Sequence, residues 1–359
     1  MTSATPTTGT ATPTEVFARQ IGPWLSAQRP GAPAVEIVDA TEPAQGFSSR
    51  TILFTARWQE SGRAMERALV ARIQRDVAVP MLADVFHQYR VMRAIAANST
   101  VKVPQIAFAE SDPGVVGAPF FIMERLYGRV PPDFPSYHAQ GWVADLTTAE
   151  RTQLWWNGIA EMARLHRIDW RCFPFLASGT DTPPDAVFYL DRFVGNWFDW
   201  ARNGQPFAVI ADALAYLKAH APPAAQSGLV WNDARLGNTM YTADGIAVAS
   251  LFDFEVATLG PPEVDLAHWV YLDEVFSENF GVARIDGLPR GAEAVAGFER
   301  IYGRPMPQFS FYMAVAALKI LILSVRNYGN DKDMGAPEAL PDFLVNRLAH
   351  YLHEFKAGR

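Results

Sequence analysis

The sequence Leu229-Val-Trp-Asn-Asp-Ala-Arg-Leu-Gly-Asn238 is followed closely by Leu251-Phe-Asp-Phe-Glu255. Between them, two apolar segments flank Ala243-Asp244-Gly245, a combination typical of a tight hairpin turn. Because a hairpin folds back on itself, we expect Asn238 and Asp253 to lie close together, although fifteen positions separate them. The region therefore predicts a polar loop, a hairpin and a second polar loop that meet at one place.

The polar residues of this region match the requirements of phosphoryl transfer. That reaction needs a carboxylate to accept a hydroxyl proton, ligands for magnesium and positive charge on the phosphates. Asp233 precedes Asn238 by five positions, so one loop can present a base and a metal ligand. Asp253 would be the second ligand, and Arg235 would hold the γ-phosphate. The region therefore suits phosphoryl transfer to a hydroxyl group, with Asp233 as the candidate base and Mg²⁺ held between Asn238 and Asp253.

The spacing of Asp233 and Asn238 is weak evidence by itself, because the chain contains it twice. The second copy is Asp191-Arg-Phe-Val-Gly-Asn196. No turn-bearing hairpin follows this copy, and the next carboxylate, Asp212, lies in a stretch with helical character. We therefore interpret Asp191 as an ordinary surface or pocket residue.

Composition narrows the possible partners and locations. The net charge of −7 and the pI near 5.5 come without a basic stripe, so we expect neither nucleic acid nor a membrane surface as partner. Cys172 is the one cysteine, which excludes an intrachain disulfide. The longest apolar run, Phe311 to Val325, is interrupted by Lys319 and is too short to span a bilayer. We expect a buried helix there and a cytoplasmic protein.

The order of patterns along the chain predicts an α+β fold with three parts. Residues 1–14 are rich in Thr, Ala and Pro and are expected to form a disordered tail. Residues 15–124 mix strand and helix patterns and predict a small β-rich lobe. Residues 125–359 predict a larger, mainly helical lobe. Expected elements are a turn and strand over 46–54, strands over 68–73 and 120–123, and helices over 85–97 and 147–168, the last with a capping box.

Five segments together resemble the aminoglycoside phosphotransferase-like family. The first stretch is similar to the family's catalytic loop, which commonly reads Leu-Val-His-Gly-Asp-Tyr-Arg-Leu-Gly-Asn. The other matching segments, in the family's order, are the phosphate loop at Gly46-Phe-Ser-Ser49, the hinge at Phe121-Ile-Met-Glu-Arg-Leu126, a helix end at Met162 to Asp169, and the metal-binding segment at Phe252 to Ala267. The resemblance covers roughly residues 40 to 330. It implies a protein-kinase-like, two-lobed fold that binds ATP.

The resemblance also implies a role for each matching residue. Asp233 would be the base, and Asn238 and Asp253 the magnesium ligands. Asp265 would brace the catalytic loop rather than touch substrate. The implied nucleotide-binding residues are Ser48 and Ser49 in the phosphate loop, Arg72 on the third strand, Gln88 on the helix, and Glu124 to Leu126 through their backbone.

Three positions depart from the family pattern. Trp231-Asn232 replaces His-Gly before the catalytic aspartate, so the loop must be braced differently. Ala234 replaces a common tyrosine. Gln88 occupies the position of a glutamate that usually pairs with the strand's basic residue, here Arg72. An amide can still form a hydrogen bond with the guanidinium, but without charge assistance.

The acceptor is expected to be a small-molecule alcohol. Polycationic aminoglycosides require many carboxylates, whereas the helical lobe offers few candidates, namely Asp191, Asp199, Asp273 and Glu274. We therefore favour a neutral or amphipathic acceptor, such as a hydroxylated metabolite, a macrolide-like lactone or a hydroxyacyl thioester. The alternatives are a true aminoglycoside phosphotransferase, a nucleotide-binding module without catalysis, and a protein kinase, which the missing Ala-Pro-Glu segment disfavours. The oligomeric state and the preference for ATP over GTP stay open.

Overall fold

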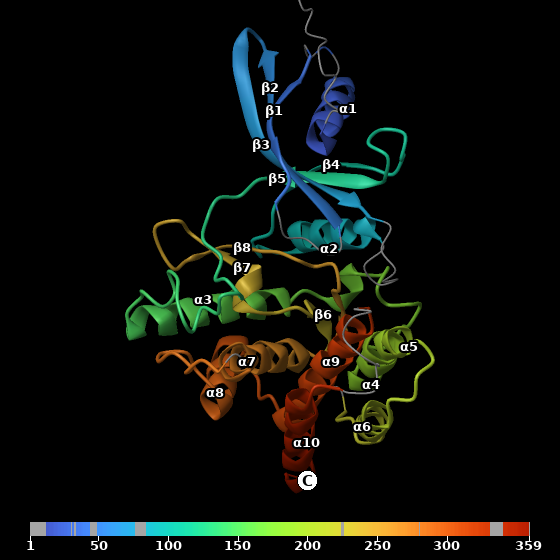
Figure 1. Cartoon of the computed structure of the whole chain (residues 1–359), viewed down its shortest axis with the longest axis vertical. Coiled ribbons are helices and arrows are strands. Elements are labelled where there is room, and N and C mark those ends of the chain that lie inside the picture. The colour runs from blue at the N-terminus through green and yellow to red at the C-terminus, as the bar shows by residue number, and fades with distance from the viewer. Residues whose placement is uncertain are drawn as a thin grey trace, which may run out of the picture. The chain divides into compact units, whose positions relative to one another are not determined.

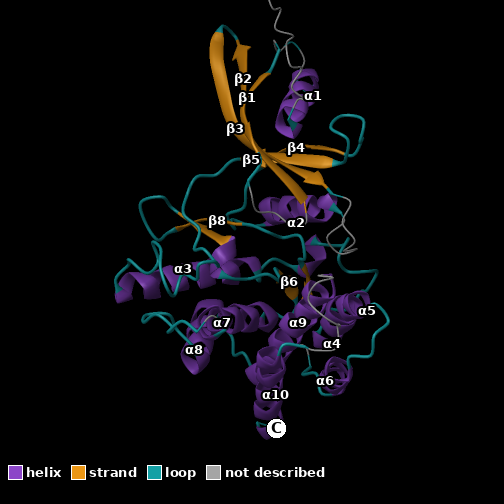
Figure 2. Cartoon of the chain, viewed as in Figure 1, coloured by secondary structure: helices purple, strands orange, loops and turns teal. Residues whose placement is uncertain are grey.

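The computed structural model describes residues 12–29, 31, 34–43, 49–75, 84–223, 226–279, 281–330 and 340–358. Backbone contacts divide the chain into two compact units. The first unit comprises Met1–Arg90 and Pro104–Leu126, and the second comprises Val91–Val103 and Tyr127–Arg359. Figure 1 and Figure 2 show a β-rich first unit and a mainly helical second unit, which confirms the predicted α+β class.

The first unit is built on a five-stranded antiparallel sheet with the strand order β1-β2-β3-β5-β4. The strands are β1 (Glu36–Thr41), β2 (Ser49–Glu60), β3 (Arg63–Gln74), β4 (Ile106–Glu110) and β5 (Phe120–Glu124), and the helices are α1 (Pro13–Ala27) and the start of α2 (Val85–Asn98). The strands expected near 46–54, 68–73 and 120–123 and the helix over 85–97 are therefore confirmed where they are described. Residues 46–48 lie outside the described residues.

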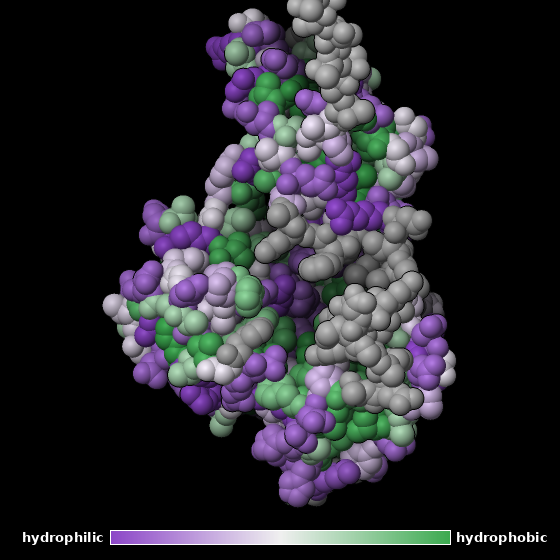
Figure 3. All heavy atoms as spheres, viewed as in Figure 1, coloured by the Kyte–Doolittle hydropathy of each residue, from purple (hydrophilic) through white to green (hydrophobic). Residues whose placement is uncertain are grey.

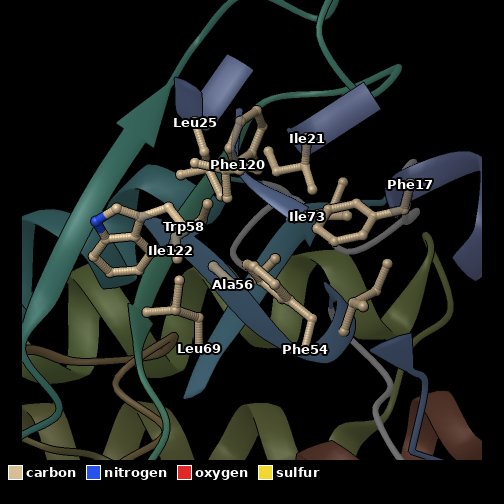
Figure 4. Close-up of a cluster of buried hydrophobic side chains, with 13 residues drawn as sticks. Phe17, Ile21, Leu25, Phe54, Ala56, Trp58, Leu69, Ile73, Phe120 and Ile122 are labelled. Carbon is tan, nitrogen blue, oxygen red and sulfur yellow. The ribbon is translucent and has the colours of Figure 1, made fainter. Parts of the chain in front are cut away.

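Helix α1 supplies one side of the first unit's core. Its residues Phe17, Ile21 and Leu25 recur at helical spacing and lie against one face of the sheet (Figure 4). On that face, Phe54 of β2 meets Phe17 edge to face, with ring centroids 5.4 Å apart. Alternate strand residues such as Leu69 and Ile73 complete the same cluster. Residues at the intervening positions, including Arg72, are thereby placed on the opposite face.

The predicted tail was wrong at its C-terminal end, because α1 begins at Pro13 rather than after Thr14. Thr12 and Glu15 form a reciprocal capping box, and proline at the first helical position favours helix initiation. The composition of the tail concealed these signals. Residues 1–11 lie outside the described residues.

The second unit consists mainly of helices around two short antiparallel strand pairs, β6–β9 and β7–β8. Its longer helices are α3 (Thr148–Leu165), α6 (Ala208–Ala219), α7 (Glu263–Glu278), α8 (Gly291–Tyr302), α9 (Phe309–Asn330) and α10 (Asp342–Ala357). Its shorter elements are α4 (Ala186–Tyr189), a π-helical segment (Leu190–Gly195), α5 (Asn196–Arg202), β6 (Gly228–Val230), β7 (Thr239–Tyr241), β8 (Val248–Leu251) and β9 (Thr258–Gly260), with 3₁₀ turns at Trp170–Cys172 and Leu236–Asn238.

Two local predictions for the second unit are confirmed. Thr147 and Glu150 form the expected capping box at the start of α3, although the helix ends at Leu165, slightly before the predicted position. The apolar run before Val325 forms the buried helix α9. Within the described ranges, no helix is long and apolar enough to cross a membrane. In the view of Figure 3, hydrophilic and hydrophobic residues are interspersed over the described surface.

Candidate active site

The catalytic loop connects β6 to β7 within the second unit, and Asp233 lies in its middle. The carboxylate is surrounded by donors. Asn238 Nδ2 donates to Asp233 Oδ2 at 2.6 Å, and Arg235 Nε lies 3.2 Å from Oδ1 and 3.3 Å from Oδ2. His268 Nε2 on α7 lies 3.5 Å from Oδ1. The structure thus brings the predicted base, the predicted ligand Asn238 and the predicted cation Arg235 together.

Asp233 is held in its ionised form. Burial by itself would raise the pKa of this carboxyl, but the charge of Arg235, the hydrogen bond from His268 and the charge of Lys319 together hold its pKa well below the usual value. Its side chain retains 30% exposure, so a hydroxyl group can approach it. The arrangement suits a carboxylate that receives a proton only as the acceptor oxygen becomes bonded.

Asp265, at the start of α7, braces the catalytic loop as the resemblance implied. Its Oδ2 accepts hydrogen bonds from Trp231 N at 2.6 Å and from His166 Nε2 at 2.8 Å, and its Oδ1 accepts from Asn232 N at 2.7 Å. Asp265 and His166 are fully buried. One carboxylate therefore fixes two backbone N–H groups of the loop. This contact orients the backbone at the next residue, Asp233, and so the direction of its side chain.

The hairpin brings the second predicted metal ligand to the first. Strands β7 and β8 pair from Thr239 opposite Leu251, and Phe252 N donates to Asn238 O at 3.2 Å. Asp253 follows directly, with a left-handed φ of 66° that aspartate tolerates better than most residues. The hairpin expected between residues 238 and 254 is therefore confirmed, and with it the approach of the two polar loops.

The donor set at this point fits a magnesium ion. The amide nitrogen of Asn238 is occupied by Asp233 O and Oδ2, so its Oδ1 is the atom left for a cation. Asp253 provides a carboxylate one residue beyond the contact with Asn238. The described residues contain no group of three or more His, Cys, Asp or Glu suited to hold a metal. Magnesium commonly uses one or two protein oxygens and takes its other ligands from phosphate and water, so a two-residue set is sufficient.

Arg235 is paired with two carboxylates, one of which the sequence did not predict. Its Nη1 forms a close ion pair with Asp133 Oδ2, while Nε contacts Asp233. Burial would lower the pKa of Arg235, but the charges of Asp233, Asp133 and Asp253 raise it. Asp133 lies a hundred residues upstream in a Pro-rich loop, and no spacing rule connects it to the catalytic loop. The predicted contact of Arg235 with the γ-phosphate stays a prediction.

Trp231 and Asn232, which replace the family's His-Gly, hold the catalytic loop through hydrogen bonds of their own side chains. The indole Nε1 of Trp231 donates to Phe252 O at 3.0 Å and to Asp253 O at 3.2 Å, which ties the catalytic loop to the second polar loop. Asn232 has a left-handed φ of 72°, a conformation that glycine would adopt without strain. Its side-chain Nδ2 donates to Val256 O at 2.8 Å.

The nucleotide-binding residues predicted in the first unit lie partly outside the described residues. Ser48 is among the residues that are not described, whereas Ser49 begins β2 and is buried. Arg72 Nη1 donates to Thr51 Oγ1 on the neighbouring strand at 3.1 Å. Its other cross-strand neighbour, Phe121, contacts Tyr89 of α2, with ring centroids 6.1 Å apart.

Gln88 and the predicted hinge also belong to the first unit. Gln88, on α2, is buried. Glu124 ends β5, and its backbone N–H donates to Gln105 O at 2.9 Å. Leu126 follows at the end of the unit and is partly buried. The roles of Ser49, Arg72, Gln88, Glu124 and Leu126 in nucleotide binding stay predictions.

The comparisons identify a family of related sequences. A family model described as the phosphotransferase enzyme family matches residues 39–303. Among curated proteins, acyl-CoA dehydrogenase family member 10 of Mus musculus is 26% identical over 269 residues, which cover 72% of this chain and 24% of the relative. The probable acyl-CoA dehydrogenase IBR3 of Arabidopsis thaliana is 26% identical over 286 residues, covering 72% of this chain and 32% of the relative. The chain thus spans about a quarter to a third of these relatives.

Solved structures share the fold at low sequence identity. A Ralstonia eutropha protein superposes with a TM-score of 0.65 at 21% identity, covering 94% of this chain and 96% of the other. Macrolide 2'-phosphotransferase type I gives a TM-score of 0.56 at 17% identity, covering 93% and 96%. An aminoglycoside phosphotransferase in a ternary complex with ADP and hygromycin B gives 0.55 at 16% identity, covering 93% and 98%. The protein-kinase-like fold expected from the sequence is confirmed.

Proposed function

Because the chain belongs to the phosphotransferase enzyme family, we propose that it transfers the γ-phosphate of ATP to a hydroxyl group of a small molecule. The observation that carries the proposal is the environment of Asp233. This carboxylate lies within one loop that also holds Asn238 and Arg235, and the hairpin returns Asp253 to the same place. A base, two oxygen ligands and a cation are the parts that the reaction requires.

In the proposed reaction, Asp233 accepts the proton of the acceptor hydroxyl while that oxygen bonds to the γ-phosphorus and the bond to the β-phosphate oxygen breaks. Asn238 Oδ1 and Asp253 would hold magnesium, which when bound neutralises charge on the phosphate oxygens. Arg235 adds a positive charge beside the base. The residues of the first unit, namely Ser48, Ser49, Arg72 and Gln88 with the backbone of Glu124 to Leu126, would hold the nucleotide.

The ion pairs of the acidic residues in the helical unit support a neutral or amphipathic acceptor. Each of the four carboxylates considered for binding a polycation already pairs with a cation of the chain. The pairs are Asp191 with Lys218, Asp199 with Arg202, Asp273 with Arg284, and Glu274 with Arg347. A polycationic aminoglycoside would have to displace these partners. The curated relatives named as acyl-CoA dehydrogenases favour a hydroxyacyl thioester among the acceptors that we consider.

The test is an acceptor panel with ATP and Mg²⁺, in which phosphorylated product is detected by mass spectrometry. The panel contains hydroxyacyl-CoA thioesters, a macrolide, a neutral polyol and an aminoglycoside, each assayed with wild type and Asp233→Asn. We expect Asp233-dependent product with a neutral or amphipathic member. Preferred turnover of the aminoglycoside would contradict the acceptor class. ATP binding without Asp233-dependent product from any member would instead show a nucleotide-binding module without catalysis.

A further inference from the structure

Lys319 is a buried cation that the proposed mechanism does not use. It is the charged residue inside the apolar run Phe311 to Val325 of α9, and it is only 6% exposed. An unpaired ammonium group in such surroundings is strongly unfavourable, so its position requires specific partners. Figure 1 shows α9 beside α7, the helix that carries Asp265 and His268, and the two helices pack together.

The partners of Lys319 belong to the catalytic loop. Its Nζ donates to Asn232 O at 2.5 Å and lies 3.1 Å from Asn232 Oδ1. Tyr189 OH, from α4, donates to the same Oδ1 at 2.8 Å. Asn232 immediately precedes the catalytic base, and its carbonyl belongs to the peptide bond that joins it to Asp233. The ammonium group therefore holds the peptide from which Asp233 extends.

We propose that Lys319 is a positioning residue for the phosphotransfer reaction, which fixes the peptide that carries Asp233 and places a buried positive charge behind the base. The inference rests on the proposed function. It also accounts for Asn232 at a position where the family commonly has glycine, because a glycine would offer Lys319 only a carbonyl oxygen. Together, Lys319 and Asn232 connect α9 to the active site.

The charge of Lys319 is set by the groups that face it. Burial lowers the pKa of Lys319 from 10.5 to about 8, and the charges of Asp233 in the catalytic loop and Asp265 on α7 oppose this effect. Burial and the positive charge of Lys319 lower the pKa of His268 on α7. The hydroxyl of Tyr189 shares the Asn232 oxygen. Because Lys319 loses its proton as the pH rises through about 8, we expect kcat of the wild type to fall there.

The variant Lys319→Met separates positioning from a contribution to stability alone. Methionine fills similar space in an apolar helix but removes both the charge and the donor. We expect kcat to fall about 10- to 100-fold, since small displacements of a catalytic group have effects of this size, while KM for ATP changes less than about twofold. The fall of kcat above pH 8 should also disappear. Lys218→Met, which removes the surface partner of Asp191, is the matched control and should retain wild-type kinetics.

Hydrogen exchange provides a readout that does not depend on turnover. The amides of Trp231 and Asn232 should exchange at least about tenfold faster in Lys319→Met than in wild type, with smaller changes elsewhere. An unchanged kcat in Lys319→Met, beside an inactive Asp233→Asn, would overturn the role of Lys319 and leave the proposed function intact. Unchanged exchange at these two amides would overturn it even if wild type showed no turnover. Wild type without Asp233-dependent turnover would overturn the proposed function separately.

Discussion

Two regions of the chain share the spacing of an aspartate five residues before an asparagine, and the fold treats them differently. Asp233 and Asn238 lie in a loop that ends in a 3₁₀ turn, where their side chains meet at 2.6 Å. Asp191 and Asn196 lie along continuous helical backbone, where Asn196 Nδ2 donates to Arg192 O at 2.8 Å. Asp191 instead pairs with Lys218, so the two side chains of this copy are held by different partners. The same spacing therefore has chemical meaning only in the loop.

The largest difference between the two regions is expected in kcat when each aspartate is replaced by asparagine. Asp233→Asn removes the proposed base, and we expect kcat to fall about 10²- to 10⁴-fold. Asp191→Asn removes a half-exposed carboxylate whose partner is Lys218, and kcat should stay within about twofold of wild type. The measurement is ATP-dependent product formation with the best acceptor of the panel. Equal losses in the two variants would show that the loop geometry does not assign the base.

The predictable part of this site was local in sequence. The hairpin turn at Asp244, the capping box at Thr147 and the apolar period of α2 each depend on neighbouring residues, and each is confirmed. The hairpin was the decisive signal, because it converts a separation of fifteen residues into a contact without knowledge of the rest of the fold. The family resemblance added the bracing role of Asp265, which the hydrogen bonds bear out.

The unpredicted part consists of contacts made by distant segments. Asp133, His268 and Lys319 reach Asp233 and its neighbours from a loop and from two helices elsewhere in the second unit. A sequence pattern shows that a helix has a buried face, but not which partner that face meets. Lys319 shows one signal in the sequence, a charge inside an apolar run, which indicates an interruption of that run but not the partner of the charge. The start of helix α1 is not distinguished by composition, because Thr12 and Pro13 resemble the preceding Thr- and Pro-rich residues.

The two regions should also differ in how much they contribute to the free energy of unfolding, because the buried carboxylate of Asp265 braces the first region. In Asp265→Asn, the amide cannot accept all the hydrogen bonds from Trp231 N, Asn232 N and His166 Nε2. We expect the free energy of unfolding to fall by about 3–5 kcal/mol, as when one partner of a buried ionic network is lost. Asp191→Asn should change it by less than about 0.5 kcal/mol. Urea unfolding followed by tryptophan fluorescence measures both values, and similar losses would contradict the assigned bracing.

The smallest expected difference between the two regions concerns how the free energy of unfolding depends on acid pH, and it involves His268. Burial and the charge of Lys319 lower the pKa of His268 from 6.5 to about 4, against the opposing effect of Asp233. Between these values the unfolded chain binds a proton that the folded chain does not, so stability falls as the pH falls from about 6.5 to 4. This difference in pKa corresponds to a loss of at most about 3 kcal/mol in the free energy of unfolding. Urea unfolding at several pH values should show that the free energy of unfolding falls less steeply with acidification in His268→Gln than in wild type. Lys218→Met, which removes the partner of Asp191 in the second region, should keep the wild-type dependence. Equal slopes in His268→Gln and wild type would mean that the imidazole beside Asp233 is not held neutral by its surroundings.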